Sequence, residues 1–567
     1  MNKKLFNVSL ALATAIILFA TSCSSSLKPL SQSNFKVTPS PLETVGMEVP
    51  VTVNGTFPEK WFHPNATVTI TPVLKYAGNK ELKATPYTYQ GEKAAGNGIT
   101  IPKKRGGNFV MNFKFPYQEG MEVAELFMRF DAQIKNKKAN LPDVKVADGV
   151  ITTSVLADAL TTDPSFSDDN FQRIIKEKQE EAIMFLIESA ELRQSELTKE
   201  GLQAWKKRVE EAFSDPKQQI ALEIGGYASP DGPLTLNETL AQQRMKNSLN
   251  YLDKEFKKKN ISTDINTHYT EEDWEGFKQL VEASDLQDKE LIIRILSMYT
   301  DPEEREQQIK NLSHIYQELA ETVLPELRRA RLIASINIIG KTDDEIMSFW
   351  RNDPKKLNIE ELLYATTLTD NDAEKERIYQ YITVNFPQDY RGWNNLGALF
   401  YKQGNINKAE QSFNRAAQIS PNAPEVNMNL ALIAMINNDL DKAEELLGKA
   451  GGAKNLNAAL GLLYLKKGEY NKATEAFGNL KSNNAALAQL LVKDYSKASQ
   501  TLAAIPNPDA TTAYLAAIVA ARTNNFNDVL TNLQTAIQRD KSMAQKAAND
   551  LEFAKYRTNS EFVSLIQ

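Results

Sequence analysis

Residues 390–421 read YRGWNNLGALFYKQGNINKAEQSFNRAAQISP, and this stretch decides the fold of the C-terminal part of the chain. Its spacing predicts two helices that pack against each other as a hairpin. Gly397 and Ala409 are small where the helices are expected to cross, because a larger side chain there would push them apart. The groove between the helices is expected to be filled by larger apolar residues, namely Trp393, Leu396, Phe400 and Phe413.

The same phase recurs downstream. Ala431 repeats it 34 residues after Gly397, Gly461 repeats it after a shorter step, and residues 514–533 contain a weaker copy. Upstream, a helix pair at about 358–386 is expected to cap the series. The strongest unit resembles a tetratricopeptide repeat (TPR) at Trp393, Leu396, Gly397, Phe400, Gly404, Ala409, Phe413, Ala416 and Pro421. The resemblance implies an all-α TPR solenoid over residues 355–567 that binds protein or peptide partners.

The N-terminus is predicted to be a secretion signal over residues 1–22, with Lys3 and Lys4 before an apolar stretch at 5–20. Cys23 follows small residues and is the chain's single cysteine. The stretch 20–23 resembles the lipobox of bacterial lipoproteins, although Ala20 departs from the usual larger apolar residue. The resemblance implies that Cys23 carries lipid, such as palmitate, and anchors the protein in the outer membrane. The alternative is an ordinary signal peptide with an incidental cysteine.

Residues 23–35 are predicted to be a tether. Residues 24–28 lack the acidic run that surface-directed lipoproteins carry in some lineages, which favours the periplasmic face. The formal net charge of -6 is spread along the chain without a basic stripe, so nucleic acid is not expected as a partner. With a single cysteine, no disulfide within the chain is possible.

Residues 36–160 are predicted to form a β-sandwich. Short apolar or alternating runs, separated by Pro, Gly and Asn, occur at 49–53, 67–70, 109–115 and 124–130. This region offers no site chemistry, and His63 is expected to be a turn residue.

Residues 165–342 are predicted to be an α/β domain. The expected elements are strands at 182–187 and 220–224, a helix at 197–213, a glycine-rich loop at 225–232 and a helix ending near 252. Asn237 and Arg244 lie seven residues apart on the second helix, which places them on one face. This pattern resembles the C-terminal domain of the OmpA-like family, which binds peptidoglycan.

The resemblance implies that Arg244 binds a carboxylate of the diaminopimelate stem while Asn237 braces the loop. The family's loop aspartate is Ser229 here, and serine cannot supply the negative charge that holds an ammonium group. Asp231, two residues further on, is the candidate replacement. The alternative is a domain that keeps the fold and has lost muropeptide binding.

A helical insertion is predicted at about 270–319, between strands at 263–268 and 332–338. It has too many apolar residues at helical spacing to be disordered. Trp274 is expected to be a packing anchor or part of a partner surface.

These observations favour a lipid-anchored cell-envelope scaffold over an enzyme. An accessory subunit of an outer-membrane assembly or secretion complex is the alternative, and it differs only in its partner. An envelope hydrolase has less support, because the three histidines, His63, His268 and His314, lack metal-ligand spacing and no nucleophile motif is present. No catalytic residue, metal site or cofactor is expected.

Overall fold

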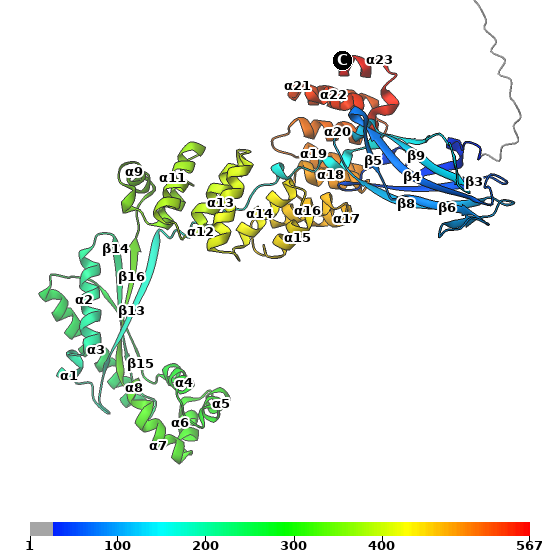
Figure 1. Cartoon of the computed structure of the whole chain (residues 1–567). Helices are drawn as coiled ribbons and strands as arrows, with labels where there is room; N and C mark the ends of the chain where they lie inside the picture. The colour runs from blue at the N-terminus through cyan, green and yellow to red at the C-terminus, as the bar shows by residue number, and fades with distance from the viewer. Residues whose placement is uncertain (1–26) are drawn as a thin grey trace, which may run out of the picture. The chain divides into compact units, whose positions relative to one another are not determined.

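The computed structural model describes residues 27–567 (Figure 1). The predicted signal peptide, Cys23 and the first part of the tether lie outside the described residues. The chain divides into two compact units. One contains the described residues up to Asp168 together with Tyr379–Gln567, and the other contains Asp169–Ile378. The strands predicted at 36–160 and most of the helices predicted at 355–567 belong to the same unit.

The N-terminal region of the first unit forms two main sheets. The first has the antiparallel order β1-β3-β8, with β1 (Phe35–Thr38), β3 (Glu48–Phe57) and β8 (Gly107–Pro116). The second has the order β10-β9-β4-β6-β7, with β5 beside β4 and β11 beside β9. Its strands are β4 (Ala66–Tyr76), β5 (Lys80–Lys83), β6 (Tyr87–Gly91), β7 (Ile99–Ile101), β9 (Glu125–Ile134), β10 (Lys137–Ala139) and β11 (Val144–Asp148). The short strands β2 (Leu42–Glu43) and β12 (Val150–Ile151) pair in parallel.

Alternating burial explains why these segments are strands. Along β3, Val49, Val51 and Val53 are buried while the residues between them face outward, and Val68 and Ile70 repeat the pattern on β4. The buried residues of both sheets belong to one hydrophobic core. The prediction of a strand-rich N-terminal region is therefore confirmed.

The second unit contains a sheet of order β13-β16-β14-β15. Its strands are β13 (Ile174–Met184), β14 (Gln218–Tyr227), β15 (Ile265–Thr270) and β16 (Arg329–Ile339). Strand β16 is antiparallel to β13 and β14, whereas β14 and β15 are parallel. The helices α1 (Gln194–Leu197), α2 (Glu200–Ser214) and α3 (Leu234–Lys258) complete this part of the unit, and α2 and α3 pack on the sheet (Figure 1). Trp205 and Val209 of α2 contribute to the core formed with the sheet.

Strand β13 lies earlier than the predicted strand at 182–187. Its first eight residues, 174–181, are largely charged and exposed, so the apolar alternation that marks a strand is missing. They form a sheet edge that pairs with β16 alone, and charged residues are common on such edges. Of the apolar residues that prompted the prediction, Ile183 and Met184 lie at the end of β13, whereas Leu186 and Ile187 lie beyond it and are 56% and 62% exposed.

The stretch between β15 and β16 is helical. It contains α4 (Trp274–Ala283), α5 (Lys289–Met298), α6 (Pro302–Lys310), α7 (Ser313–Thr322) and α8 (Leu324–Leu327). These helices share a separate hydrophobic core that includes Phe277, Ile292 and Leu319. Trp274 packs edge-on against Phe277, with 5.7 Å between ring centroids. The unit continues with α9 (Asp343–Asn352) and α10 (Ile359–Ala365).

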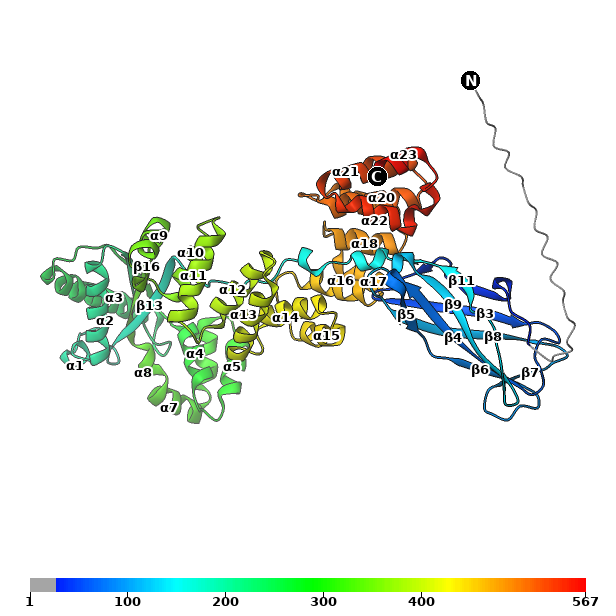
Figure 2. The same ribbon diagram turned by 45° about the horizontal axis from the view of Figure 1, so that its top comes forward.

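The rest of the chain is an all-helical array, seen from a second direction in Figure 2. Consecutive helices pack as pairs: α12/α13, α14/α15, α16/α17, α18/α19 and α20/α21. The bounds are α11 (Asp372–Asn385), α12 (Tyr390–Lys402), α13 (Ile406–Ile419), α14 (Pro424–Ile436), α15 (Leu440–Gly448), α16 (Leu456–Lys466), α17 (Tyr470–Phe477), α18 (Asn483–Leu491), α19 (Tyr495–Ala503), α20 (Ala510–Arg522), α21 (Phe526–Arg539), α22 (Ser542–Asn549) and α23 (Ser560–Ile566). The prediction of an all-helical, TPR-like C-terminal region is confirmed.

Two glycines of the array lie where the helices of a pair contact each other closely. A Cβ atom on Gly397 would come within 2.7 Å of the Phe413 ring, and one on Gly461 would come within 2.7 Å of the Phe477 ring. Most of the predicted packing side chains surround the first contact: Leu396, Phe400, Ala409 and Phe413 are buried, Trp393 is half-buried, and Pro421 is exposed in the turn before α14. The α12/α13 and α16/α17 pairs therefore each close on a position where only hydrogen fits.

Candidate functional site

Residues 157–168, called the docked segment below, run along the first helices of several pairs in the array (Figures 1 and 2). Four asparagines on these helices hold the segment. Asn394 and Asn395 lie on α12, Asn429 on α14 and Asn484 on α18, and together they form the asparagine face.

Two asparagines each hold the complete main-chain polar pair of one serine. The Ser165 N–H donates to Asn429 Oδ1 at 2.7 Å, and Asn429 Nδ2 donates to the Ser165 carbonyl at 2.8 Å. The Ser167 N–H donates to Asn395 Oδ1 at 2.7 Å, and Asn395 Nδ2 donates to the Ser167 carbonyl at 3.1 Å. A carboxamide carries one acceptor and two donors, so it can pair with a backbone as a neighbouring strand would.

A third pair of the same kind holds the other end of the docked segment. The Asp158 N–H donates to Asn484 Oδ1 at 3.0 Å, and Asn484 Nδ2 donates to the Asp158 carbonyl at 2.7 Å. The Tyr401 hydroxyl donates to the Ala159 carbonyl at 2.5 Å. The array therefore recognises the main chain of the docked segment at both ends.

All four asparagines of this face are buried. Asn394 Nδ2 donates to the Ser165 carbonyl at 3.0 Å, and Asn429 Nδ2 donates to Asn394 Oδ1 at 2.9 Å. Buried amides are costly unless their hydrogen bonds are made. The network is therefore satisfied only while an extended main chain lies against it.

Lysines of the array face the acidic residues of the docked segment. Lys402 pairs with Asp163 at 3.7 Å, and Lys454 pairs with Asp168. Both pairs are largely exposed, so each contributes little to stability. Burial lowers the pKa of Lys466, while the nearby charge of Asp158 opposes that change.

The residues before the docked segment join the strands to the array. Ser154 Oγ donates to the Gly46 carbonyl at 2.7 Å, and the Gly46 N–H donates to the Tyr470 hydroxyl at 2.9 Å. Arg522 of α20 pairs with Glu552 at 2.5 Å and with Glu43 at 3.1 Å. Burial disfavours the charged guanidinium, but the hydrogen bonds and charges of these glutamates raise the pKa of Arg522 overall. The N-terminal end of the docked segment is therefore firmly held.

The asparagine face was not predicted from the sequence, although one signal was available. Asn395 and Asn429 are 34 residues apart (429 − 395), the same step that relates Gly397 to Ala431. They occupy the same position in consecutive repeats, two residues before the small residue at the helix crossing. A polar residue repeated at one position of a solenoid indicates a shared ligand-facing role.

The residues predicted to bind peptidoglycan are engaged within the second unit. The guanidinium of Arg244 is 1% exposed and donates to the carbonyls of Tyr227 at 2.9 Å, Ser189 at 3.0 Å and Leu186 at 3.3 Å. Burial lowers its pKa to about 10, so Arg244 remains charged at neutral pH. Asn237 Nδ2 donates to the Gly232 carbonyl at 3.0 Å, which is the loop-bracing contact that the resemblance implied.

Ser229 and Asp231 meet an arginine that was given no role in the sequence-based prediction. Arg328 Nη2 pairs with Asp231 Oδ2 at 2.9 Å, Arg328 Nε donates to Ser229 Oγ at 3.2 Å, and the Ser229 hydroxyl donates to Asp231. The adjacent Pro230 lines a small apolar cavity together with Trp274 of the inserted helices. The charge of Asp231 is thus already paired inside the fold, and the prediction that these residues bind muropeptide has no support from this geometry.

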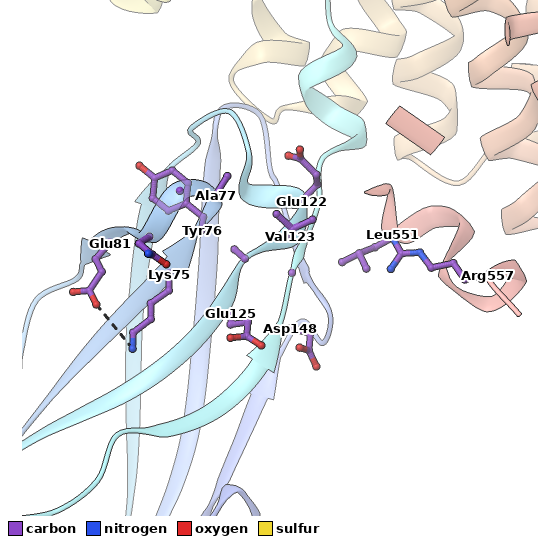
Figure 3. Close-up of a pocket in the computed structure, with 14 residues that line it drawn as sticks. Lys75, Tyr76, Ala77, Glu81, Glu122, Val123, Glu125, Asp148, Leu551 and Arg557 are labelled. Atoms are coloured by element: carbon purple, nitrogen blue, oxygen red, sulfur yellow. Dashed lines mark ion pairs between the residues drawn. The ribbon is translucent and has the colours of Figure 1, made fainter. Parts of the chain in front are cut away.

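The first unit also has an open cleft of about 850 Å³ between its strands and the C-terminal end of the array. Figure 3 shows Leu551 and Arg557 on one side and acidic residues such as Glu125 and Asp148 on the other. Glu125 and Asp148 both pair with Lys145, at 2.5 and 2.6 Å. These carboxylates form charge pairs within the strand region.

The histidines of residues 27–567 are not grouped. His63 Nδ1 accepts from the Asn65 N–H at 3.1 Å in a turn, and His268 Nε2 lies 2.9 Å from the Tyr227 hydroxyl. In this part of the chain, no three His, Cys, Asp or Glu side chains are placed to hold a metal ion.

No helix among the described residues is both long and apolar enough to cross a membrane.

Comparison with known families identifies a tetratricopeptide repeat at residues 390–423. The match covers α12 and α13, and Asn429 lies just beyond it on α14, the first helix of the next pair. No curated protein matches the chain.

Solved structures give weak overall similarity. A tetratricopeptide repeat protein from Parabacteroides merdae is 14% identical over 36% of this chain and 88% of its own, with a TM-score of 0.29. Pseudomonas aeruginosa PilF is 14% identical over 40% of this chain and 98% of its own, with a TM-score of 0.26. Yeast Tom70 is 11% identical over 58% of this chain and 80% of its own, with a TM-score of 0.25. All three TM-scores are below 0.5, so the similarity is limited to parts of the chain.

Proposed function

We propose that the protein is a lipid-anchored scaffold of the cell envelope that binds protein partners through its TPR array. The anchor is Cys23, and the proposed location is the periplasmic face of the outer membrane. The proposed role is non-catalytic, and neither a cofactor nor nucleic acid is part of it.

The observation that carries this proposal is the asparagine face. Asn395, Asn429 and Asn484 each pair with both main-chain polar groups of a single residue in the docked segment. An array with this chemistry can bind extended polypeptide, which is how many peptide-binding surfaces gain affinity from the main chain. The geometry thus supports protein binding and gives no comparable support to hydrolysis.

The finer fold assignments are part of the same proposal. Two sheets around one core support a β-sandwich at residues 36–160. The sheet order β13-β16-β14-β15, with α3 connecting the parallel strands β14 and β15, supports an OmpA-like fold at residues 165–342. Peptidoglycan binding is not included in the proposed function, because Arg244 and Asp231 are engaged within the unit.

An accessory role in an outer-membrane assembly or secretion complex is the alternative. It requires the same array and differs in the partner alone. Identification of the crosslinked partner decides between the two, since a barrel protein or secretion subunit would favour the alternative.

Site-specific photo-crosslinking in intact cells tests the proposal. A photoreactive residue replaces Lys402 or Lys454 beside the docked segment, or the exposed Asn414 elsewhere on the array. Lys207, exposed on α2 of the second unit, is the matched control position. We expect a discrete protein adduct from at least one array position and none from Lys207. No adduct at any array position, or the same adducts from Lys207, would overturn the proposal.

A further inference from the structure

The main-chain contacts of the asparagine face do not depend on the sequence of the docked segment. Asn429 and Asn395 pair with the N–H and carbonyl of Ser165 and Ser167, which any residue other than proline also offers. The same face can therefore hold another extended chain in the same register.

The docked segment has no fully buried large side chain to anchor it. Its buried residues are small or short, namely Ala157, Ala159, Thr162, Pro164, Ser165 and Ser167. Leu160 is 52% exposed, and Phe166 is half-buried. Tightly held peptides usually depend on buried large side chains, so this segment is held mainly by hydrogen bonds.

One contact in the docked segment is also imperfect. The Ser165 hydroxyl is buried and has no hydrogen-bond partner among the described residues. A buried hydroxyl without a partner costs stability. A segment with alanine or glycine at this position would make the same main-chain bonds without that cost.

Charge favours one class of ligand over others. Lys402 and Lys454 pair with Asp163 and Asp168, and Lys466 lies near Asp158. Acidic residues along an extended chain therefore match the lysines that border the asparagine face. A basic or neutral segment would leave those lysines unmatched.

The two ends of the docked segment are held differently. Before it, Ser154 is buried and bonded to Thr44 and Gly46 of the strand region. After Ser167, the first unit ends at Asp168, whose contact is an exposed ion pair with Lys454. Release of the C-terminal end requires loss of the hydrogen bonds that hold Ser165 and Ser167, whereas the residues before the segment also contact the strand region.

We propose that the docked segment is an internal, displaceable ligand, and that the asparagine face binds in its place an extended acidic segment of a partner protein. This proposal rests on the proposed function, because it names the partner chemistry and the regulation of the same array. A partner segment must compete with the docked segment, which is tethered to the same chain. The ease with which the docked segment is released therefore controls the affinity for the partner.

The first test uses a fluorescent peptide with the sequence of residues 157–168 and the full-length chain. The double substitution Ser165→Pro and Ser167→Pro removes the two N–H groups that donate to Asn429 and Asn395. The asparagine face itself is unchanged in this variant. We expect this variant to bind the peptide at least tenfold more tightly than wild type. Ser165→Ala is the matched control: it keeps the N–H and removes the unpartnered hydroxyl, so it should not tighten peptide binding.

Two further arms define the site and the charge preference. Adding Asn395→Ala and Asn429→Ala to the proline variant should abolish peptide binding. A peptide with asparagine at its aspartate positions should bind more weakly, and the difference should shrink at high salt. If the folded proline variant binds no more tightly than wild type, the docked segment is a permanent part of the structure and the proposal is wrong.

Hydrogen exchange on the wild-type chain covers the case in which the proline variant does not fold. Excess unlabelled peptide should accelerate exchange of the Ser165 and Ser167 amides, and unchanged exchange would overturn the proposal. A concentration-dependent dimer with the same accelerated exchange would identify a second copy, not a partner, as the occupant. Crosslinking that succeeds only at Asn414 would preserve the proposed function while this inference fails.

Discussion

The asparagine face of the array and the glycine-rich loop of the second unit are both built from buried polar side chains. The first contacts a segment outside the helices, whereas the second contacts the main chain of its own fold. Asn429 pairs with Ser165, 264 residues away, in a segment that is not part of the helical array. Arg244 instead bonds to the carbonyls of Leu186 and Tyr227, which belong to the loops and strand of its own unit. A contact with a separate segment can be exchanged for a similar one, whereas a contact that completes a fold cannot.

The largest expected effect is that of Arg244→Ala on the second unit. The substitution removes a buried charge and the Arg244 hydrogen bonds to three carbonyls, of which Leu186 still accepts from the Ser189 N–H. The loss should cost about 3–5 kcal/mol of stability. Thermal unfolding of the full chain measures the loss of stability. Hydrogen exchange of β14 shows which transition belongs to the second unit. Arg244→Lys is the control and should recover part of it. A stable Arg244→Ala variant that no longer sediments with purified sacculi would show instead that Arg244 is a ligand-binding residue.

The next effect concerns the helix crossing that shapes the array. Gly397→Ala places a methyl group 2.7 Å from the Phe413 ring, and overpacking of this kind should cost about 1–3 kcal/mol. Gly448→Ala is the matched control, since a Cβ there meets nothing within 4 Å and alanine favours the helix by up to about 1 kcal/mol. In denaturant unfolding, the free energy of unfolding should fall for Gly397→Ala and rise for Gly448→Ala. Equal effects would mean that the crossing does not depend on a glycine.

A loss no larger than that of Gly397→Ala is expected from Asn429→Ala. It removes the acceptor of the Ser165 N–H, whereas the Ser165 carbonyl still accepts from Asn394 Nδ2. The change should cost about 1–3 kcal/mol if the N–H remains buried and less if the docked segment moves away. Limited proteolysis within residues 157–168 distinguishes the two cases, because a released segment is cleaved faster. Asn414→Ala, on the exposed side of α13, should change stability by no more than about 0.5 kcal/mol. Identical cleavage in both variants would contradict an exchangeable contact.

The smallest effect on folding is expected from Cys23→Ser. We expect no change in the stability of either unit. The variant should leave the membrane fraction, since lipid attachment is the proposed anchor. Fractionation of cells after a high-salt wash measures this, with wild type as the reference. Membrane association that persists in the variant would mean that another attachment exists.

The sequence by itself determined the local elements. The spacing of small and large apolar residues predicts the helix pair from Trp393 to Phe413, and alternation predicts strands such as β3 and β8. These patterns are visible because each element buries one face against a core. Strand β13 shows the limit: its charged edge carries no apolar alternation, so its position required the pairing with β16.

Only the tertiary structure decided which polar groups meet. Arg328 reaches Asp231 across 97 residues, and Asn429 reaches Ser165 across 264. The partner in the second contact is main chain, which is chemically the same at nearly every residue and therefore leaves no mark in the sequence. The repeat predicted a surface suited to binding a polypeptide, but the fold alone shows that the chain's own segment occupies it.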